Sequence, residues 1–280
     1  MAYDEHMEPR RTAAHQPIAL QIADDLRIKI ETGALRSGDS LPTLQELTKM
    51  YSCSSTSARG AIALLKQQGL VIGGRGLPPT VRPPARRVER SSARHQAEKD
   101  LTREPEEVRR NHGLAEDDMG SSLDGFEFET NYAMVAADAD LADAFRVQEG
   151  TALLRRDFKH RDKQTRSLDA SSISWLLHDV ISKNPKISDP EYAAWPGGTM
   201  HQLYTVGIEV DKVVDYVTSA MPTTVELQTW NLATGTPLLL VRRISIDTTD
   251  RVVEVSDAQY PADRTMLTFE TQLKRWDENK

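Results

Sequence analysis

Apolar residues recur every four positions near the start of the chain, at Ile18, Ile22, Leu26 and Ile30, with mostly polar residues between them. This spacing places the four side chains on one face of an α-helix. Gly33 is suited to end the helix, because glycine readily adopts the left-handed conformation found at helix C-termini. The pattern therefore predicts an amphipathic helix from about residue 17 to residue 33.

Two further helices are predicted after this one. Thr43 and Glu46 have the T-x-x-E spacing of a capping box, in which each side chain satisfies a free backbone N–H group at the start of a helix. The helix that they begin extends to about Tyr51. Ser54 is a suitable N-cap for a third helix, which extends to Gln68.

A β-hairpin is predicted to follow the third helix. Residues 70–72 indicate a short strand, residues 73–76 a glycine-rich turn, and Thr80 and Val81 the returning strand. Three helices and a hairpin, with the last two helices joined by a tight turn, are typical of a winged helix-turn-helix. The first part of the chain is therefore predicted to be a DNA-binding domain.

The third helix has the two faces that a DNA-recognition helix needs. Its first turn, which enters the major groove in such domains, carries small hydroxyl side chains and one arginine. Hydroxyl groups can contact phosphates or bases, and an arginine can bind guanine or phosphate through two hydrogen bonds. The polar residues are Ser55, Thr56, Ser57 and Arg59, and the residues expected to pack on the core are Ala58, Ala61, Ile62 and Leu65.

The pattern changes after this domain. Residues 84–122 are highly charged and hold few apolar residues, which predicts a polar linker with a short helix around residues 105–112; partial disorder is an equal alternative. Helices and strands then alternate. Strands are predicted at residues 152–160, 167–176, 210–220, 237–247 and 252–260, and helices at residues 138–145, 188–191, 201–207 and 223–232.

Two segments of this second region repeat one pattern, at residues 142–162 and 225–250. Each has an apolar helix, a Gly-Thr pair, a strand with two adjacent arginines and a turn with an aspartate. A duplicated helix–hairpin unit favours a mainly antiparallel sheet with helices on one face, so the predicted fold class is α+β. The predicted divisions are a disordered tail at 1–16, the winged helix-turn-helix at 17–83, the linker at 84–122 and a second domain at 123–275.

Charge is distributed unevenly along the chain, whose net charge is -7. Residues 54–95 hold eight basic residues and one acidic residue, whereas residues 185–270 hold six basic and twelve acidic residues. A basic segment attracts DNA phosphates locally while an acidic remainder does not. From charge alone, a solvent-exposed run without a partner is an equal alternative.

Other features exclude several classes of protein. No apolar run approaches the roughly 18 residues of a membrane span, and the polar N-terminus lacks the apolar region of a secretory signal. The single cysteine, Cys53, fits a cytoplasmic protein and is predicted to be a small core residue rather than a redox sensor. None of the seven histidines has the spacing of a zinc site, so no metal and no cofactor are expected.

Residues 17–81 resemble the GntR superfamily of bacterial transcription regulators. The most specific match is Gly-x-Leu-x-x-Gly-Asp-x-Leu-Pro-Thr at residues 33–43, supported by residues 54–59 and 64–70. An arginine of the family that contacts DNA is replaced here by Gln45, which can still pair with adenine, so this departure affects the operator sequence. The residues expected to contact DNA are Thr43, Gln45, Ser54, Ser55, Thr56, Ser57, Arg59 and, at the tip of the wing, Arg75.

Residues 123 to about 270 resemble the UTRA effector-binding domain of the HutC subfamily, which has a fold like that of chorismate lyase. The resemblance is carried by residues 142–156, 196–207 and 230–263. It implies a homodimer that binds a palindromic operator on double-stranded DNA and responds to a small molecule. The pocket positions of the family correspond to Thr199, Glu254 and Tyr260, whose hydroxyl and carboxylate groups suit a small polar metabolite.

The sequence does not decide which residues of the first pocket strand face the ligand. Family members with anionic ligands have two basic residues there, and one alignment puts Asp157 and Lys159 at these positions. An acid at this place argues against a sugar-phosphate effector. If the register shifts by one residue, Arg155 or Arg156 takes the position instead.

Two other functions are compatible with this pattern. The likeness to chorismate lyase allows an enzymatic second domain, but no nucleophile–base pair or metal set supports one. A repressor without an effector, whose second domain only forms the dimer, is the other alternative. Because Thr199, Glu254 and Tyr260 are retained, the sequence favours a repressor with a functional pocket over both.

Overall fold

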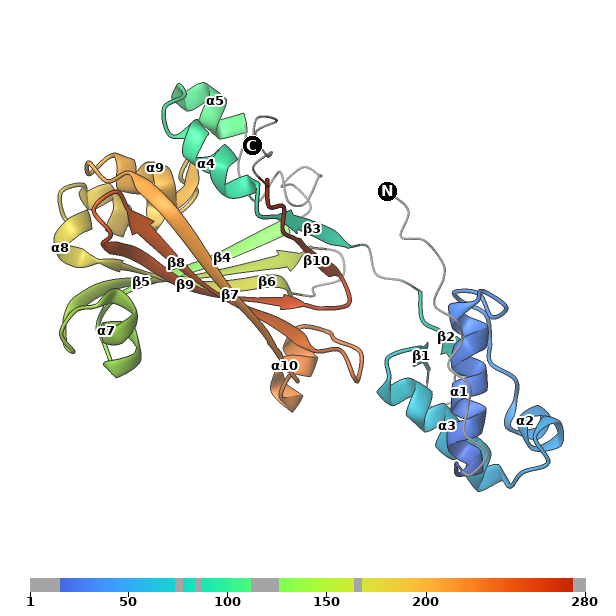
Figure 1. The fold of residues 1–280 in the computed structure, drawn as a ribbon. Helices are drawn as coiled ribbons and strands as arrows, with labels where there is room; N and C mark the ends of the chain where they lie inside the picture. Colours follow the sequence, from blue (N-terminus) through green and yellow to red (C-terminus); the bar gives the residue numbers. More distant parts are fainter. Residues whose placement is uncertain (1–15, 74–77, 84–86, 112–125, 164–167, 274–280) are drawn as a thin grey trace, which may run out of the picture. The chain divides into compact units, whose positions relative to one another are not determined.

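The computed structural model describes residues 16–73, 78–83, 87–111, 126–163 and 168–273 (Figure 1). The chain divides into two compact units. The N-terminal unit comprises Met1–Ala85 with Leu232–Thr236, and the C-terminal unit comprises Arg86–Asn231 with Pro237–Lys280.

Three helices and a small hairpin form the N-terminal unit, as predicted. They are α1 (Ile18–Glu31), α2 (Leu44–Met50), α3 (Ser55–Gln67), β1 (Val71–Ile72) and β2 (Thr80–Val81). The apolar positions of the helices are fully excluded from solvent at Ile22, Leu26, Leu47 and Leu65. Because these side chains recur at helical spacing, burying one face of each helix is enough to build the core.

Local capping sets where the second and third helices begin. The Thr43 side chain accepts a hydrogen bond from the Glu46 backbone N–H, and the Glu46 carboxylate accepts one from the Thr43 backbone N–H. The Ser54 hydroxyl accepts a hydrogen bond from the Ser57 N–H at the start of α3. Both predicted caps are confirmed. The predicted wing residue Arg75 lies outside the described residues.

A six-stranded antiparallel sheet dominates the C-terminal unit, in the order β4-β5-β6-β9-β8-β7 (Figure 1). Its strands are β4 (Phe126–Ala136), β5 (Ala152–Asp162), β6 (Leu168–Leu177), β7 (Val210–Ala220), β8 (Leu238–Asp247) and β9 (Val252–Pro261). The α+β class is confirmed. The strand β4 is missing from the elements that the sequence predicts.

Helices cover both faces of this sheet, not one face as the repeated pattern predicts. They are α7 (Ala139–Phe145), α8 (His178–Ile181) and α9 (Gly198–Tyr204), with 3-10 turns at Pro185–Ser188 and Pro190–Tyr192. The helix α10 (Thr224–Thr229) follows β7 and has no buried residue. Arg242 on the sheet reaches Asp140 of α7 from one face, whereas Glu254 lies on the other face near α9. Adjacent residues of one strand can therefore both be buried, as Leu153 and Leu154 are. The sequence of such a strand does not show the alternation of apolar and polar residues that is typical of a sheet with one exposed face.

Part of the predicted linker belongs to the C-terminal unit. It contains β3 (Val88–Ser91), α4 (Arg94–Leu101) and α5 (Glu106–Asn111), of which only the last was expected. The strand β3 pairs in parallel with β10 (Thr265–Thr268), and α4 packs against α9. Residues 88–111 are therefore ordered elements, because a partner strand far away in the sequence supplies hydrogen bonds that the local pattern does not reveal.

Candidate functional site

The first turn of α3 presents its polar side chains to solvent. Ser55, Thr56 and Arg59 are exposed, while Ala58 and Ala61 on the opposite face are fully buried. The helix is fixed by its packing, so the exposed groups are held on a rigid element. This is the arrangement that contact with base edges and phosphates in a DNA groove requires.

Three other predicted DNA-contacting residues have structural roles of their own. The hydroxyls of Ser54 and Ser57 lie 3.0 Å apart at the cap of α3. The Thr43 hydroxyl donates to the Glu46 carboxylate over 2.9 Å, and the Thr43 backbone N–H holds the pKa of Glu46 below its usual value. Gln45 is exposed on the first turn of α2. Among the predicted DNA-contacting residues that the structure describes, Gln45, Ser55, Thr56 and Arg59 are therefore the ones that are exposed without such a capping role.

A buried polar cluster lies in the C-terminal unit between α9 and the sheet. Its centre is Arg156 of β5, whose side chain is 1% exposed. The guanidinium donates to Gln202 Oε1 at 2.6 Å, to Ser174 Oγ at 2.7 Å and to Thr199 Oγ1 at 3.2 Å. We call the following residues the Arg156 cluster: Arg156, Ser174, Thr199, Gln202, Ser245 and Glu254.

Glu254 neutralises the charge of Arg156 within this cluster. Its Oε1 lies 3.3 Å from Arg156 Nη2 and accepts a 2.7 Å hydrogen bond from Ser174. The other oxygen accepts a bond from Ser245 at 3.2 Å. Both oxygens thus have partners in a site with little solvent, as a buried ion pair requires.

Two donor groups of this site have no hydrogen-bond partner within the described part of the chain. They are Arg156 Nε and the hydroxyl of Tyr132, both of which are buried. Tyr132 stands directly opposite Arg156 in the pairing of β4 with β5. Burial raises the pKa of Tyr132, and the charge of Arg156 opposes that rise. Both groups can donate to an oxygen atom of a bound molecule.

Comparison with known proteins matches each unit separately. Residues 18–77 match the family described as bacterial regulatory proteins, gntR family, and residues 130–265 match the UTRA domain. The chain belongs to the GntR family and carries a UTRA domain. This GntR-family regulator therefore has the HutC-type architecture that the sequence predicts, with a DNA-binding and an effector-binding domain.

Two relatives span nearly the whole regulator. An uncharacterized HTH-type transcriptional regulator of Streptomyces coelicolor is 25% identical over 258 residues, which are 90% of this chain and 92% of the relative. The crystal structure of a GntR-family transcriptional regulator is also 25% identical. It matches with a TM-score of 0.67 and covers 92% of this chain and 99% of its own.

The regulator does not bring all its predicted pocket residues together. Arg156, Thr199 and Glu254 meet in the Arg156 cluster. Arg155, adjacent to Arg156 on the strand, points to the other face and pairs with Asp157 at 2.7 Å. Lys159 is exposed on that same face. The alignment that placed Asp157 and Lys159 in the pocket therefore does not describe this strand, and Arg156 is the basic residue that points inward.

Tyr260 is separated from the cluster along the sheet. It follows Glu254 by six residues on β9, which corresponds to about 20 Å. Its buried ring packs with Ala170 and Val241, and the guanidinium of Arg90 lies 4.3 Å from the ring centre. Tyr260 therefore belongs to a contact with β3 in this structure.

Glu98, a buried carboxylate of α4 that lies close to the cluster, was not predicted from the sequence. It is 6% exposed and accepts a 3.3 Å hydrogen bond from the Met200 backbone N–H. Burial and the nearby carboxylate of Glu254 raise the pKa of Glu98 to about 7, against the opposing charges of Arg243 and Arg94. A Cβ at residue 198 would lie 2.7 Å from Glu98 Oε1, and Gly198 has φ +64°, so glycine permits this approach.

The described residues contain no group of three His, Cys, Asp or Glu side chains that could hold a metal ion. Among those same residues no helix is both long and apolar enough to cross a membrane. Cys53 is half-buried and packs against the core of the N-terminal unit, as expected for a small core residue.

Proposed function

We propose that this GntR-family regulator is a repressor that binds a palindromic operator as a homodimer and is controlled by a small polar metabolite at the Arg156 cluster. The observation that carries the effector site is the pair of buried donors, Arg156 Nε and the Tyr132 hydroxyl, which have no hydrogen-bond partner among the described residues. A buried donor without an acceptor is unfavourable by about 1–3 kcal/mol. An acceptor oxygen on the metabolite removes that penalty from both groups.

The charge balance of the site favours an uncharged metabolite. Arg156 is already paired with Glu254, so a phosphate or carboxylate has no unpaired positive charge to neutralise there. Asp157, the acid that made a sugar phosphate unfavourable in the sequence, lies on the opposite face of the sheet from Arg156. The Arg156–Glu254 pair supplies a different reason for the same expectation.

DNA binding is assigned to the exposed first turn of α3. Ser55, Thr56 and Arg59 are the groups proposed to enter the major groove, with Gln45 beside them on α2. A single recognition helix covers little DNA, and a two-fold dimer doubles the contact while requiring an inverted repeat. Footprinting on the promoter of the regulator's own gene tests this, and protection of a sequence without an inverted repeat contradicts it.

Support for a second copy of the chain comes from the edge strand β7. Within the described residues it has a sheet partner on one side only. Tyr216 and Val217 on this strand are exposed, as are Met221 and Val225 just beyond it. Two copies of an antiparallel edge strand can pair about a two-fold axis. Sedimentation as a monomer at micromolar concentration contradicts the dimer.

Coupling between the effector and DNA is proposed to pass through α4. Glu98 of α4 contacts the first turn of α9, and Thr199 of that turn contacts Arg156. A metabolite that moves Thr199 therefore changes how α4 docks, and α4 lies in the segment that follows the DNA-binding unit. Allostery requires that the metabolite favour one of two such arrangements.

A thermal-shift screen of polar metabolites, run on the wild type and on Thr199→Val, tests the effector site. We expect at least one uncharged metabolite to stabilise the wild type and to stabilise Thr199→Val less, because the Thr199 hydroxyl helps to hold the Arg156 guanidinium in the position that the metabolite contacts. No stabilisation by any metabolite favours the effector-independent repressor. Chemical conversion of the stabilising metabolite favours the enzyme.

A further inference from the structure

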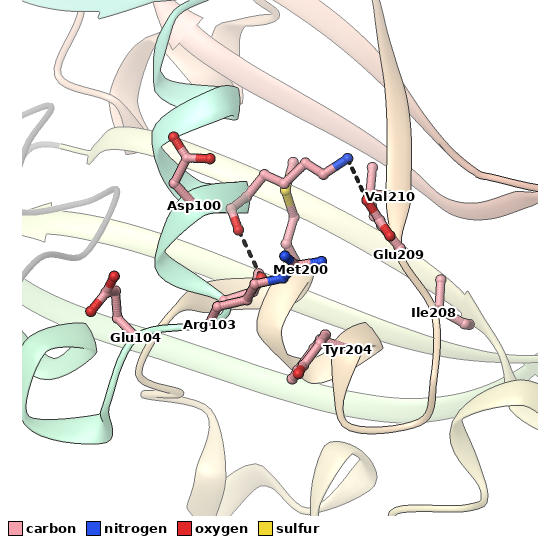
Figure 2. Close-up of a pocket in the computed structure, with 10 residues that line it drawn as sticks. Asp100, Arg103, Glu104, Met200, Tyr204, Ile208, Glu209 and Val210 are labelled. Carbon is pink, nitrogen blue, oxygen red and sulfur yellow. Dashed lines mark hydrogen bonds and ion pairs between the residues drawn. The ribbon is translucent and has the colours of Figure 1, made fainter.

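A hollow in the C-terminal unit lies beside α9 and is lined by none of the residues of the Arg156 cluster. It has a volume of about 320 Å³ and is enclosed by α4 with the residues that follow it, by α9 and by the start of β7. Figure 2 shows Asp100 and Arg103 on the α4 side and Met200 and Tyr204 on α9. We call this hollow the α4 cavity. Its volume is within the range of small-molecule sites.

The Arg156 cluster and the α4 cavity are lined by different faces of α9. Thr199 and Gln202 contact Arg156, whereas Met200 and Tyr204, four residues apart, line the α4 cavity. Residues spaced by three or four positions share a helix face, so the two pairs point in different directions. The α4 cavity is therefore distinct from the proposed effector site.

One wall of the α4 cavity is apolar. It is formed by Met200, Tyr204, Ile208 and Val210, which come from α9 and the start of β7. Met200, Ile208 and Val210 are also members of the main core cluster, so this wall is fixed. It can cover an apolar side chain of a bound molecule.

The opposite wall carries charges of both signs that differ in their pairing. Lys99 and Glu209 form an ion pair at 2.9 Å and neutralise each other. Asp100 accepts a hydrogen bond from the uncharged Gln96 amide and forms no ion pair among the described residues. The side chains of Arg103 and Glu104 are exposed and make no hydrogen bond or ion pair in the described ranges.

We propose that the α4 cavity binds a small zwitterion with an apolar side chain, as in a free α-amino acid. The carboxylate of this ligand pairs with Arg103, and its ammonium group lies between Glu104 and Asp100. Its side chain packs on Met200 and Tyr204. The bound molecule contacts α4 and α9 together and therefore holds α4 against the C-terminal unit.

Calorimetry on the full-length protein with L-phenylalanine, phenethylamine and 3-phenylpropionate tests the ligand class. The amine lacks the carboxylate and the acid lacks the ammonium group, while all three share the ring. We expect L-phenylalanine to bind and each truncated analogue to bind at least about tenfold more weakly. Absence of binding by L-phenylalanine, L-leucine and L-tryptophan overturns the proposal, and so does equal affinity for the three phenyl compounds.

Substitutions of exposed residues test where the amino acid binds and are expected to leave the fold intact. Arg103→Gln is expected to weaken L-phenylalanine binding about tenfold and to leave phenethylamine binding unchanged. Arg110→Gln, a change of an exposed arginine of α5 away from the cavity, is the matched control and is expected to change neither. Normal binding of L-phenylalanine by Arg103→Gln overturns the site.

Thr199→Val separates this proposal from the proposed effector site. The variant removes a hydroxyl of the Arg156 cluster and is expected to bind L-phenylalanine as the wild type does. If the variant loses L-phenylalanine binding, the amino acid occupies the cluster and the α4 cavity is not its site. If the variant loses only the response to the metabolite of the thermal-shift screen, both proposals stand.

Discussion

The two units of this regulator place their polar functional groups in opposite environments. In the N-terminal unit, Ser55, Thr56 and Arg59 are exposed on a helix whose other face is completely buried. In the C-terminal unit, Arg156 and Glu254 lie inside the domain, next to the apolar core. A large partner such as DNA can be contacted only from the surface, whereas a small molecule can be enclosed.

This difference decides which residues support both folding and function. An exposed arginine is solvated in the free protein, so changing it affects binding and leaves stability almost unchanged. A buried arginine and its carboxylate partner depend on each other for hydrogen bonds. We therefore expect function and stability to be separable in α3 and inseparable in the Arg156 cluster.

The largest expected effect is the loss of Glu254. Glu254→Ala leaves Arg156 charged and buried without its carboxylate, which should lower the free energy of unfolding by about 3–5 kcal/mol. Urea denaturation followed by tryptophan fluorescence measures this, because Trp175, Trp195 and Trp230, the tryptophans among the described residues, belong to the C-terminal unit. Arg155→Ala on the opposite face is the control and should cost less than about 1 kcal/mol. Similar losses of unfolding free energy in both variants would show that the buried ion pair is no more important for stability than the exposed one.

The buried position of Glu98 can be tested by the pH dependence of folding stability. Its pKa rises from an ordinary value near 4.5 to about 7 in the folded protein, because burial and Glu254 disfavour its charge. The folded state therefore binds the proton more tightly than the unfolded chain, and stability falls as pH rises from about 4.5 to 7. The ionisation of Glu98 should lower the free energy of unfolding by about 3 kcal/mol in total.

Glu98→Gln cannot titrate, so it should lack this part of the pH dependence. We expect the wild type to lose about 3 kcal/mol of stability relative to Glu98→Gln between pH 4.5 and pH 8. Other titrating groups, such as His160 with its pKa near 4, are common to both proteins and cancel in the difference. A constant difference across this range would contradict the buried position of Glu98.

Arg59→Ala tests the exposed side of the comparison. If Arg59 contacts a base, its loss should weaken operator binding by about 1–3 kcal/mol and relax specificity at one base pair. A uniform, salt-sensitive loss on all DNA sequences would instead identify a phosphate contact. Stability in urea should not change, because Arg59 is exposed. Unchanged operator affinity would reject α3 as the recognition helix.

The smallest effect concerns the capping box of α2. Thr43→Ala removes the hydroxyl that accepts from the Glu46 N–H and should destabilise the N-terminal unit by about 1 kcal/mol. Thr43→Ser keeps the hydroxyl and is the matched control. Hydrogen exchange of the α2 amides measures the difference, and equal protection in the two variants would show that the cap contributes nothing.

The elements of the N-terminal unit could be predicted because their signals are local. Thr43 with Glu46 and Ser54 with Ser57 are three residues apart, and each pair specifies the start of a helix without help from the rest of the chain. The exposure of Arg59 follows from the apolar positions that surround it in the same helix. Short-range chemistry therefore predicted most of this unit.

The C-terminal site depends on contacts between distant parts of the chain. The sequence placed Asp157 and Lys159 in the pocket and left Arg155 or Arg156 as the alternative, because Leu153 and Leu154 are buried together and the strand does not show a clear alternation. Glu98 was missed because its partners, Met200 and Glu254, lie more than 100 residues away. Its one local signal was membership of a charged segment, which also characterises an exposed linker.

In the proposed mechanism, a metabolite bound in the C-terminal unit controls DNA binding by the N-terminal unit. Fluorescence anisotropy of labelled promoter DNA, titrated with full-length protein, tests it when the metabolite that stabilises the protein most is present or absent. A coupling of about 1–3 kcal/mol predicts operator affinity lowered roughly 5- to 150-fold by the metabolite. Equal affinities for the operator in the two titrations would contradict the account.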